Sequence, residues 1–336
     1  MTPPLVSVLL PCRDAERFLP QAIRGLELQT FADFEIVAVN DGSGDGTAAM
    51  LDRWAARDGR VRVLHREREG LAAALQAGAS LCRGRLLARA DADDFAHPRR
   101  LEEQVAYLSN HRDVAAVGTH VRYFPHEGVG WGARRYQRWL NSLSRPAELE
   151  RDIFVECPIA HPTLMLRRAA FDKVGGYRSN DWPEDYDLLL RLHLAGGRLA
   201  NVPRVRHFWR EREDRASRVD SRYAPESFRR CKVHYLRRSA LDGRECVGIW
   251  GAGRVGKDFA RTVLAAGLRL RWFLDIDPRK IGQSIYGVPV LDARVVARHR
   301  DAYLLICVGT AGARELIRRQ LAAAGFSEPA QFRCLA

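Results

Sequence analysis

The 336-residue sequence has few cysteines and no long apolar run, and each shortage excludes a class of protein. Its seven cysteines are scattered singly with no Cys-x-x-Cys pair, so neither a structural zinc site nor a disulfide framework is indicated. No stretch approaches the roughly 20 apolar residues that a membrane span requires. The N-terminus lacks a charged segment followed by an apolar one, so no export signal is indicated and we expect a cytoplasmic protein.

Acidic residues are too few to balance the basic ones, and the formal net charge is +13. Such an excess of positive charge is expected in a protein that binds an anionic membrane surface or nucleic acid, or in one whose background composition is arginine-rich. No DNA- or RNA-binding signature is present, so we expect no nucleic-acid partner. Basic clusters at 134–138 and 229–238 lie on predicted helices and either contact acidic headgroups or form a solvated face. Peripheral contact with the inner face of the cell membrane and a homo-oligomer both stay open.

The first third of the sequence alternates strand and helix patterns. Short apolar runs end at turn residues, and segments with helical spacing separate them. The predicted strands are 6–10, which we expect to end at Pro11, then 34–39, 61–64 and 85–88, with helices at 15–26, 47–56 and 71–81 between them. This order predicts an α/β fold with a mostly parallel mixed sheet between helices, in which ligands bind at the carboxyl ends of the strands.

Carboxylates crowd the end of one of these predicted strands. Asp91, Asp93 and Asp94 occupy three of four positions just after the run at 85–88. Like charges this close repel one another, so a divalent cation that carries a phosphorylated ligand is a natural partner. A solvated Asp-rich turn is the alternative. Asp41 follows another predicted strand, where it either belongs to the same nucleotide site or forms an Asx-turn.

A series of ordered motifs runs through the first two thirds of the chain. They are Val6–Pro11, Phe18-Leu19, Gln29-Thr30, Glu35–Thr47, Asp91–Asp94 with Pro98–Leu101, His161–Thr163, Gly175–Tyr177 and Glu184–Leu188. Together they resemble the family 2 glycosyltransferases of the GT-A fold. One departure is Asn40, where the family often has a first Asp, while Asp41 is retained.

The resemblance implies a catalytic domain over residues 1–240 and a reaction. The reaction is an inverting, metal-dependent transfer of a sugar from a nucleoside diphosphate sugar, with a UDP-sugar as first choice. The acceptor is a saccharide or a lipid-linked molecule in the biosynthesis of cell-surface polysaccharide or glycoconjugate. The implied cofactor is Mg²⁺ or Mn²⁺, which stabilises the charge that develops on the leaving diphosphate by several kcal/mol.

Five residues acquire roles on the donor side through the resemblance. Asp93 is the implied direct metal ligand, and Asp91 is either a second ligand or, like Asp94, a group that orients the ribose or metal-bound water. Magnesium takes only one or two protein carboxylates, so three ligating aspartates would be excessive. His207 is implied to reach the metal, and Arg210 the leaving diphosphate, because arginine matches phosphate oxygens bidentately.

The remaining implied residues hold the nucleotide base and the acceptor. Asp41 would accept a hydrogen bond from the base, and Pro11 would shape the base pocket. Asp185 is the implied general base for the acceptor hydroxyl, with Glu184 in reserve; the alternative is a pair of helix N-terminal charges. His161 is either an acceptor-side contact or a structural histidine.

A second α/β pattern begins after the basic segment, and we predict a separate domain at 244–336. A buried strand at 246–250 precedes the glycines Gly251, Gly253 and Gly256, and a helix pattern at 257–266 follows. Asp275 ends the next predicted strand about 20 residues on, as in a Rossmann-like nucleotide-binding domain. The glycines would let backbone amides approach phosphate, and Asp275 could bind ribose hydroxyls.

The ligand of this second domain stays open between NAD(P), a nucleotide sugar and none. A nicotinamide-dependent sugar oxidoreductase would make the protein bifunctional, but no Tyr-x-x-x-Lys pair is present. A noncatalytic nucleotide-sugar sensor is a further alternative, against which the retained Asp41, Asp93 and Asp185 argue.

Overall fold

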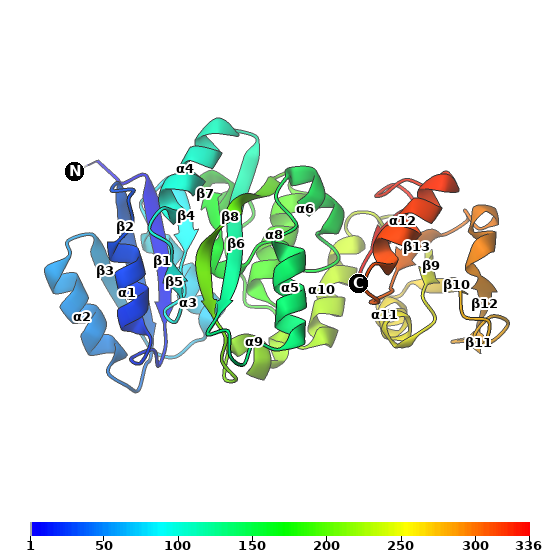
Figure 1. Cartoon of the computed structure of the whole chain (residues 1–336), viewed down its shortest axis with the longest axis horizontal. Coiled ribbons are helices and arrows are strands. Elements are labelled where there is room, and N and C mark those ends of the chain that lie inside the picture. The colour runs from blue at the N-terminus through cyan, green and yellow to red at the C-terminus, as the bar shows by residue number, and fades with distance from the viewer. Residues whose placement is uncertain (1) are drawn as a thin grey trace. The chain divides into compact units, whose positions relative to one another are not determined.

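The computed structural model describes residues 2–336 and divides into two compact units (Figure 1). The first unit contains the chain up to Glu150 together with Cys157–Asn180 and Glu184–Arg218. The second contains Arg151–Glu156, Asp181–Pro183 and Val219–Ala336. Residues 219–240 thus pack within the second unit, although the sequence motifs had suggested a catalytic domain that extends to residue 240; the functional assignment of the domains stays a prediction.

A mixed eight-stranded sheet forms the centre of the first unit. Its strands are β1 (Val6–Cys12), β2 (Phe34–Asp41), β3 (Val61–Arg66), β4 (Leu86–Arg89), β5 (Phe95–Ala96), β6 (Val114–Phe124), β7 (Met165–Arg167) and β8 (Arg198–Arg210). They lie in the order β3-β2-β1-β4-β7-β6-β8-β5. The strands β3, β2, β1 and β4 run parallel, and β7 pairs antiparallel with both β4 and β6. The predicted mostly parallel mixed sheet is therefore confirmed.

Helices connect these strands. They are α1 (Leu19–Glu27), α2 (Thr47–Arg57), α3 (Leu71–Leu81), α4 (Arg100–Asn110), α5 (Trp131–Leu140), α6 (Pro146–Asp152), α7 (Arg168–Lys173) and α8 (Glu184–Leu194), with the 3-10 turn η1 (His161–Thr163). After β8 come α9 (Ala216–Val219) and the 3-10 turn η2 (Ser221–Tyr223), which belongs to the second unit. In α1, Leu19, Ile23 and Leu26 are buried at helical spacing, which gives the helix one apolar face for the core. The predicted strand and helix alternation is confirmed for the first third of the chain.

The first strand is longer than predicted. The sequence suggested an end at Pro11, but β1 continues through Pro11 to Cys12. Proline cannot donate a ladder hydrogen bond, so it needs a position where one neighbouring strand is missing. The pairing of β1 with β4 ends at Leu9, while its pairing with β2 continues through Pro11 opposite Val39. The missing neighbour makes proline compatible with this strand.

A second, six-stranded sheet organises the other unit. Its strands are β9 (Cys246–Trp250), β10 (Arg269–Asp275), β11 (Ser284–Ile285), β12 (Val288–Asp292), β13 (Tyr303–Ile306) and β14 (Phe332–Cys334), with helices α10 (Pro225–Leu236), α11 (Arg254–Ala265) and α12 (Ala313–Ala323) and the 3-10 turn η3 (Ala293–Arg298). The order is β11-β12-β10-β9-β13-β14, and the pairs from β12 to β14 are parallel. The chain moves from β9 to β10 on one side and returns to β13 on the other, so the strand order reverses beside β9. The predicted second α/β sheet is present.

Residues from the middle of the sequence belong to this second unit. The carboxylate of Asp152 is buried and accepts a hydrogen bond from Arg318 at 2.7 Å, and Arg314 lies 3.5 Å away. The ammonium of Lys232 donates to the carbonyl oxygens of Val155 at 2.7 Å and Leu335 at 3.1 Å. The segment 151–156 is thus bonded to α10 and α12, and Lys232 of α10 also binds the C-terminal residue Leu335.

Within residues 2–336, no helix is both long and apolar enough to cross a lipid bilayer.

Candidate active site

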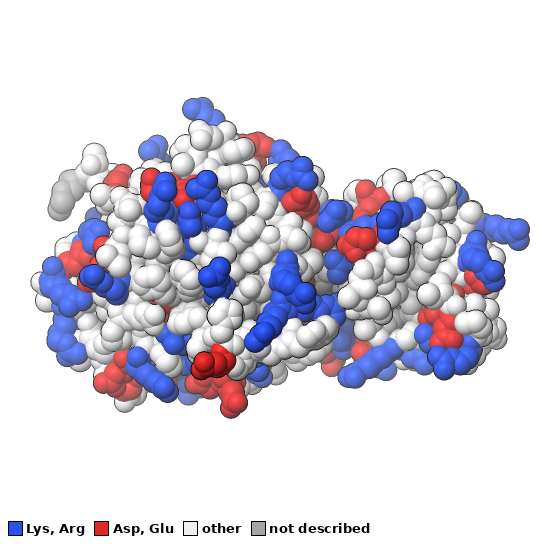
Figure 2. All heavy atoms as spheres, in the orientation of Figure 1, with Lys and Arg blue, Asp and Glu red and all other residues white. Residues whose placement is uncertain are grey.

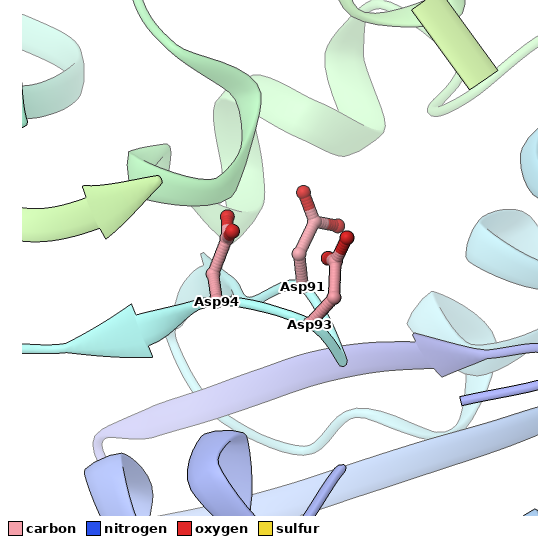
Figure 3. A group of neighbouring side chains, drawn as sticks. All are labelled: Asp91, Asp93 and Asp94. Carbon is pink, nitrogen blue, oxygen red and sulfur yellow. The ribbon is translucent and has the colours of Figure 1, made fainter. Parts of the chain in front are cut away.

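The three clustered aspartates lie in the turn between β4 and β5. Ligand oxygens of Asp91, Asp93 and Asp94 all lie within 4.8 Å of one another. Figure 3 shows their side chains projecting to the same side of this turn. The buried run of β4 ends at Arg89, so the carboxylates stand at the carboxyl end of a central strand, where the sequence pattern placed them.

The cluster carries more negative charge than its surroundings neutralise. Burial and then the neighbouring carboxylates Asp94 and Asp91 raise the pKa of Asp93 to about 7. Burial and Asp91 likewise raise the pKa of Asp94 to about 8. The guanidinium of Arg212, whose Nε lies 3.0 Å from Oδ2 of Asp93, opposes this rise without cancelling it. An additional cation would therefore stabilise the ionised cluster.

Asp94 has less capacity for a ligand than its two neighbours. Its Oδ2 lies 2.8 Å from Nε2 of His207, and its Oδ1 accepts the backbone N–H of Arg210 at 2.7 Å. Burial and then Arg100 lower the pKa of His207 to about 3. The buried Nδ1 of His207 has no hydrogen-bond partner among the residues that the structure describes. His207 is thus next to the cluster, and its role toward a metal stays a prediction.

Arg210 also lies against the cluster, as the sequence motifs suggested. Its Nε donates to the carbonyl oxygen of Asp93 at 2.7 Å, and its guanidinium stacks over the rings of Phe18 and Phe124. Arg212 lies 5.2 Å from the Phe18 ring centre. Two guanidinium groups therefore flank the aspartates on the β8 side.

Arg89 connects the cluster to the opposite side of the site. Its Nη2 lies 2.6 Å from Oδ1 of Asp91, and the side chain is only 3% exposed. Burial alone would lower the pKa of Arg89, but the charges of Asp91 and Glu184 contribute to raising it. One buried cation thus interacts with both carboxylate groups, although Asp91 and Glu184 are far apart in the sequence.

Glu184 and Asp185 begin α8, as predicted, but their surroundings differ. Glu184 is 1% exposed and its Oε1 lies 3.5 Å from Nδ1 of His161. The other ring nitrogen of His161 lies 2.9 Å from the hydroxyl of Tyr177. Asp185 is partly exposed, and its Oδ1 accepts the N–H of Tyr186 at 2.7 Å. Asp185 is therefore the more accessible of the two carboxylates.

Asp41 and Pro11 lie at the adjacent strand ends. The buried Asp41 carboxylate accepts the backbone N–H groups of Glu69 at 2.9 Å and Gly70 at 3.0 Å, just before α3. In place of the Asx-turn considered for Asp41, the neighbouring Asn40 bonds the turn, because its Oδ1 accepts the N–H of Ser43, three residues on, at 3.2 Å. Asp41 fixes the loop before α3, and its contact with a nucleotide base stays a prediction.

The second unit holds the other predicted group. Gly251, Gly253 and Asp275 line a cavity of about 710 Å³. Gly256 does not line it but lies against the loop, because an added Cβ would stand 1.7 Å from the Gly251 carbonyl oxygen. The four residues therefore lie around one loop of the second unit.

Sequence reasoning missed three residues of the first site, namely Arg89, Arg212 and Tyr177. A signal existed for Arg89, since an arginine at the end of the buried run at 86–88 requires a nearby acid. Arg212 has a weaker signal, because it follows Arg210 by two positions and so lies on the same side if the extended chain continues. Tyr177 belongs to the motif at 175–177, for which the sequence patterns predicted no role in the site.

The comparison with protein families matches residues 7–175 to the model described as glycosyl transferase family 2. A relative in Bacillus subtilis (strain 168), the putative glycosyltransferase EpsE, is 33% identical over 226 residues, which cover 66% of this chain and 78% of EpsE. Other relatives are named for the biosynthesis of amylovoran in Erwinia amylovora and of O-antigen in Escherichia coli.

Solved structures share the fold at low sequence identity. The S. aureus TarS fragment 1–349 in complex with UDP-GlcNAc has a TM-score of 0.55 and 15% identity, covering 77% of this chain and 71% of that one. The mannosyltransferase PcManGT of Pyrobaculum calidifontis, in complex with GDP-Man and Mn²⁺, has a TM-score of 0.52 and 16% identity, covering 97% and 82%. With half of the chain matched by the family model and most of EpsE aligned to it, this protein belongs to glycosyltransferase family 2 and has the GT-A fold.

Proposed function

We propose that this glycosyltransferase moves a sugar from a metal-bound nucleoside diphosphate sugar, a UDP-sugar in first place, to a hydroxyl group of a saccharide or lipid-linked acceptor, with inversion. The observation that carries the proposal is the group of three carboxylates within 4.8 Å at the end of β4. The UDP-GlcNAc complex of the similarly folded TarS supports the nucleotide. The relatives named for O-antigen and amylovoran biosynthesis support an acceptor in surface polysaccharide synthesis.

The residues present fit a hard divalent cation. Carboxylate oxygens are the ligands that Mg²⁺ and Mn²⁺ prefer, and Mg²⁺ uses one or two of them beside water and phosphate. Asp93 and Asp91 would hold the ion, because each binds one guanidinium whereas both oxygens of Asp94 are already engaged. When bound, the ion would neutralise charge on the leaving diphosphate.

The arginines on β8 and just after it complete the donor side. Arg210 is held in place by its bonds to the Asp93 carbonyl and the Gln21 side chain and by two aromatic rings, and its Nη1 group would bind a phosphate oxygen. Arg212 pairs with Asp93, and a phosphate of the donor could take the place of that carboxylate. Both cations would stabilise negative charge on the diphosphate.

Asp185 serves as the base that deprotonates the acceptor hydroxyl as it attacks the anomeric carbon. Its partial exposure supports this role over that of buried Glu184. Glu184 and His161 would then position the start of α8, since Oε1 of Glu184 lies 3.5 Å from Nδ1 of His161. Attack by the acceptor opposite the leaving diphosphate inverts the anomeric centre.

A basic cavity in the second unit supports contact with acidic lipid headgroups. Figure 2 shows Lys and Arg side chains spread over the visible face among Asp and Glu, so net charge alone identifies no surface. A concentration of charge occurs in a cavity of about 570 Å³ whose lining includes two acids, Glu226 and Asp258, and five arginines: Arg229, Arg230, Arg237, Arg238 and Arg261. We propose that these arginines bring the enzyme to a membrane that carries its acceptor.

The transfer proposal is tested by thermal shift with UDP-GlcNAc, UDP-glucose, UDP-galactose and GDP-mannose, each with and without Mn²⁺. A donor at about 100 times its dissociation constant stabilises the fold by about 2.7 kcal/mol. We expect a Mn²⁺-dependent shift in the wild type and in Asp113→Ala, an exposed acid paired with Arg198, but none in Asp93→Ala. The absence of a metal-dependent shift with every donor would refute the proposal. With the active donor, NMR of the product reports the anomeric configuration.

A further inference from the structure

The cavity of about 710 Å³ in the second unit has no part in the transfer reaction described above. It lies at the carboxyl ends of β9, β10 and β13, beside the point where the strand order reverses. Ligands of open α/β sheets bind at such points. Pockets of this size suit small molecules with a few convergent polar groups.

The glycine loop leaves room for a ligand at one position. Gly251 has φ +112°, and an added Cβ would meet the Cys307 carbonyl oxygen at 2.9 Å, so packing requires glycine there. Gly253 differs, because its φ of −83° is ordinary and the nearest atom to an added Cβ is Nζ of Lys280 at 4.0 Å. The space over Gly253 therefore belongs to the cavity, next to the N-terminus of the twelve-residue α11.

Asp275 is fully occupied by the protein itself. Its Oδ1 accepts the N–H groups of Ile276 at 2.8 Å and Asp277 at 2.9 Å. Its Oδ2 accepts the N–H of Ala252 at 2.8 Å and Nζ of Lys280 at 3.1 Å. A carboxylate offers about four acceptor sites, so these four bonds leave none for the ribose hydroxyls that the sequence pattern suggested.

The bond from Asp275 instead fixes a cation over the loop. The Lys280 ammonium donates a hydrogen bond to Asp275 at 3.1 Å and lies 3.8 Å from Asp277, and an ammonium has further N–H groups that can point into the cavity. The guanidinium-bearing Arg254 also lines the cavity from the first turn of α11. A cation, a helix N-terminus and open space over a glycine together form a site for phosphate.

An apolar rim adjoins this polar part. Val255, Ile276 and Leu316 are large apolar side chains that line the cavity and are 36%, 76% and 60% exposed. Exposed apolar groups that gather at one pocket indicate a ligand with an apolar face. A nucleotide combines such a face, in its base, with phosphate.

We propose that this cavity binds a nucleoside diphosphate whose phosphates contact Lys280 and the loop around Gly253, while the base lies against the apolar rim. Asp275 is the anchor of Lys280 and makes no bond to the ribose. The site is separate from the donor site and does not depend on the transfer proposal. Because Asp275 accepts no hydrogen bond from the ribose hydroxyls, the ribose and 2′-deoxyribose forms of the nucleotide should bind equally.

Hydrogen exchange with mass spectrometry on the full chain tests this site by location. The ligands are UDP, dUDP, ADP and uridine, in EDTA so that metal-dependent donor binding does not contribute. We expect UDP, dUDP and ADP to slow exchange in residues 251–256, by up to about 100-fold at 100 times the dissociation constant, and uridine to have no effect. Exchange in residues 91–94 should not change.

Two variants and a matched control assign the effect. Lys280→Gln should abolish the protection, whereas Arg279→Gln, with the same charge change at an 89% exposed side chain next to it, should retain it. At Gly253 the nearest atom to an added Cβ, its chain neighbours aside, is Nζ of Lys280 at 4.0 Å rather than a backbone atom, so we expect Gly253→Val to fold, to project into the cavity and to lose protection. Absence of protection by all three diphosphates in the wild type would overturn the proposal. The proposal would also be overturned if uridine protected residues 251–256 as well as the diphosphates do, if dUDP alone gave no protection, or if Lys280→Gln kept the protection.

Discussion

The guanidinium of Arg89, buried at the end of β4, lies 2.6 Å from the carboxylate of Asp91, which is 27% exposed. Removal of the acid would leave a buried cation without its closest counter-charge, and breaking such a pair costs about 3–5 kcal/mol. We therefore expect Asp91→Asn to lose about 3 kcal/mol of unfolding free energy in guanidinium titrations. The double variant Arg89→Met/Asp91→Asn should lose less than Asp91→Asn. A double variant that is less stable than both single variants would contradict this account.

Replacement of Asp93 should stabilise the fold, in contrast to replacement of Asp91. Its pKa of about 7 in the folded protein lies above the value of about 3.8 in the unfolded chain, so its ionisation destabilises the fold as the pH rises through this interval. We expect Asp93→Asn to be more stable than the wild type by about 1–3 kcal/mol at pH 8, with a smaller difference at pH 5. Denaturant unfolding at both pH values measures this. Equal differences at the two pH values would argue against repulsion within the cluster.

Asp185→Asn separates proton removal from donor binding. Loss of a general base lowers turnover by about 10²- to 10⁴-fold, whereas the substitution leaves the proposed donor contacts at Asp91 and Asp93 unchanged. We expect kcat to fall by this factor while the dissociation constant for UDP with Mn²⁺ changes less than threefold. Glu184→Gln provides the comparison. If Glu184→Gln abolishes turnover and Asp185→Asn does not, the two roles must be exchanged.

Because of the buried His161, we expect the free energy of unfolding to depend on pH. Burial and then the positive charge of Arg89 hold the pKa of His161 well below its usual value near 6.5. Below pH 6.5 the unfolded chain takes up a proton that the folded protein excludes, so stability falls as the pH falls. His161→Asn should reduce this slope between pH 6.5 and 5 by up to about 1.4 kcal/mol per pH unit. An unchanged slope, measured by urea unfolding, would show that the folded protein accepts the proton.

The basic cavity should govern membrane contact. We expect the enzyme to sediment with phosphatidylglycerol-containing vesicles, less so in high salt, and not with pure phosphatidylcholine. Charge reversal in Arg237→Glu/Arg238→Glu should weaken sedimentation at least tenfold. Arg134→Glu/Arg135→Glu, on α5 of the first unit, changes the net charge by the same amount and should sediment like the wild type. Equal loss in both pairs would assign binding to overall charge.

Sequence patterns could place Asp41 and Asp91 at one sheet edge because the parallel topology determines where the strands end. Once β2 and β4 are recognised as parallel strands beside β1, Asp41 and Asp91 must stand at the same sheet edge. The buried runs of both strands are apolar enough to be recognised without any tertiary information. The same holds for Gly251 and Asp275 in the second unit, which end the adjacent strands β9 and β10.

Side-chain partnerships were beyond this kind of reasoning. The bond from Arg89 to Asp91 depends on rotamers at the end of β4, and the influence of Glu184 on Arg89 depends on how α8 returns to the sheet. For Asp275 the residue type was recognised, but the four donors that saturate its carboxylate come from a local turn and from the loop after β9. Such occupancy is a three-dimensional property that spacing does not encode.

The assignment of residues 151–156 to the second unit limits how the protein can be divided. Asp152 and Val155 make these bonds with residues 232, 314 and 318, so a fragment that stops before residue 219 keeps one half of each pair and discards the other. A fragment that begins at residue 219 would lack the buried Asp152 carboxylate that pairs with Arg314 and Arg318. Each unit is therefore built from separate segments of the chain, and no single truncation or fusion point separates one complete unit from the other.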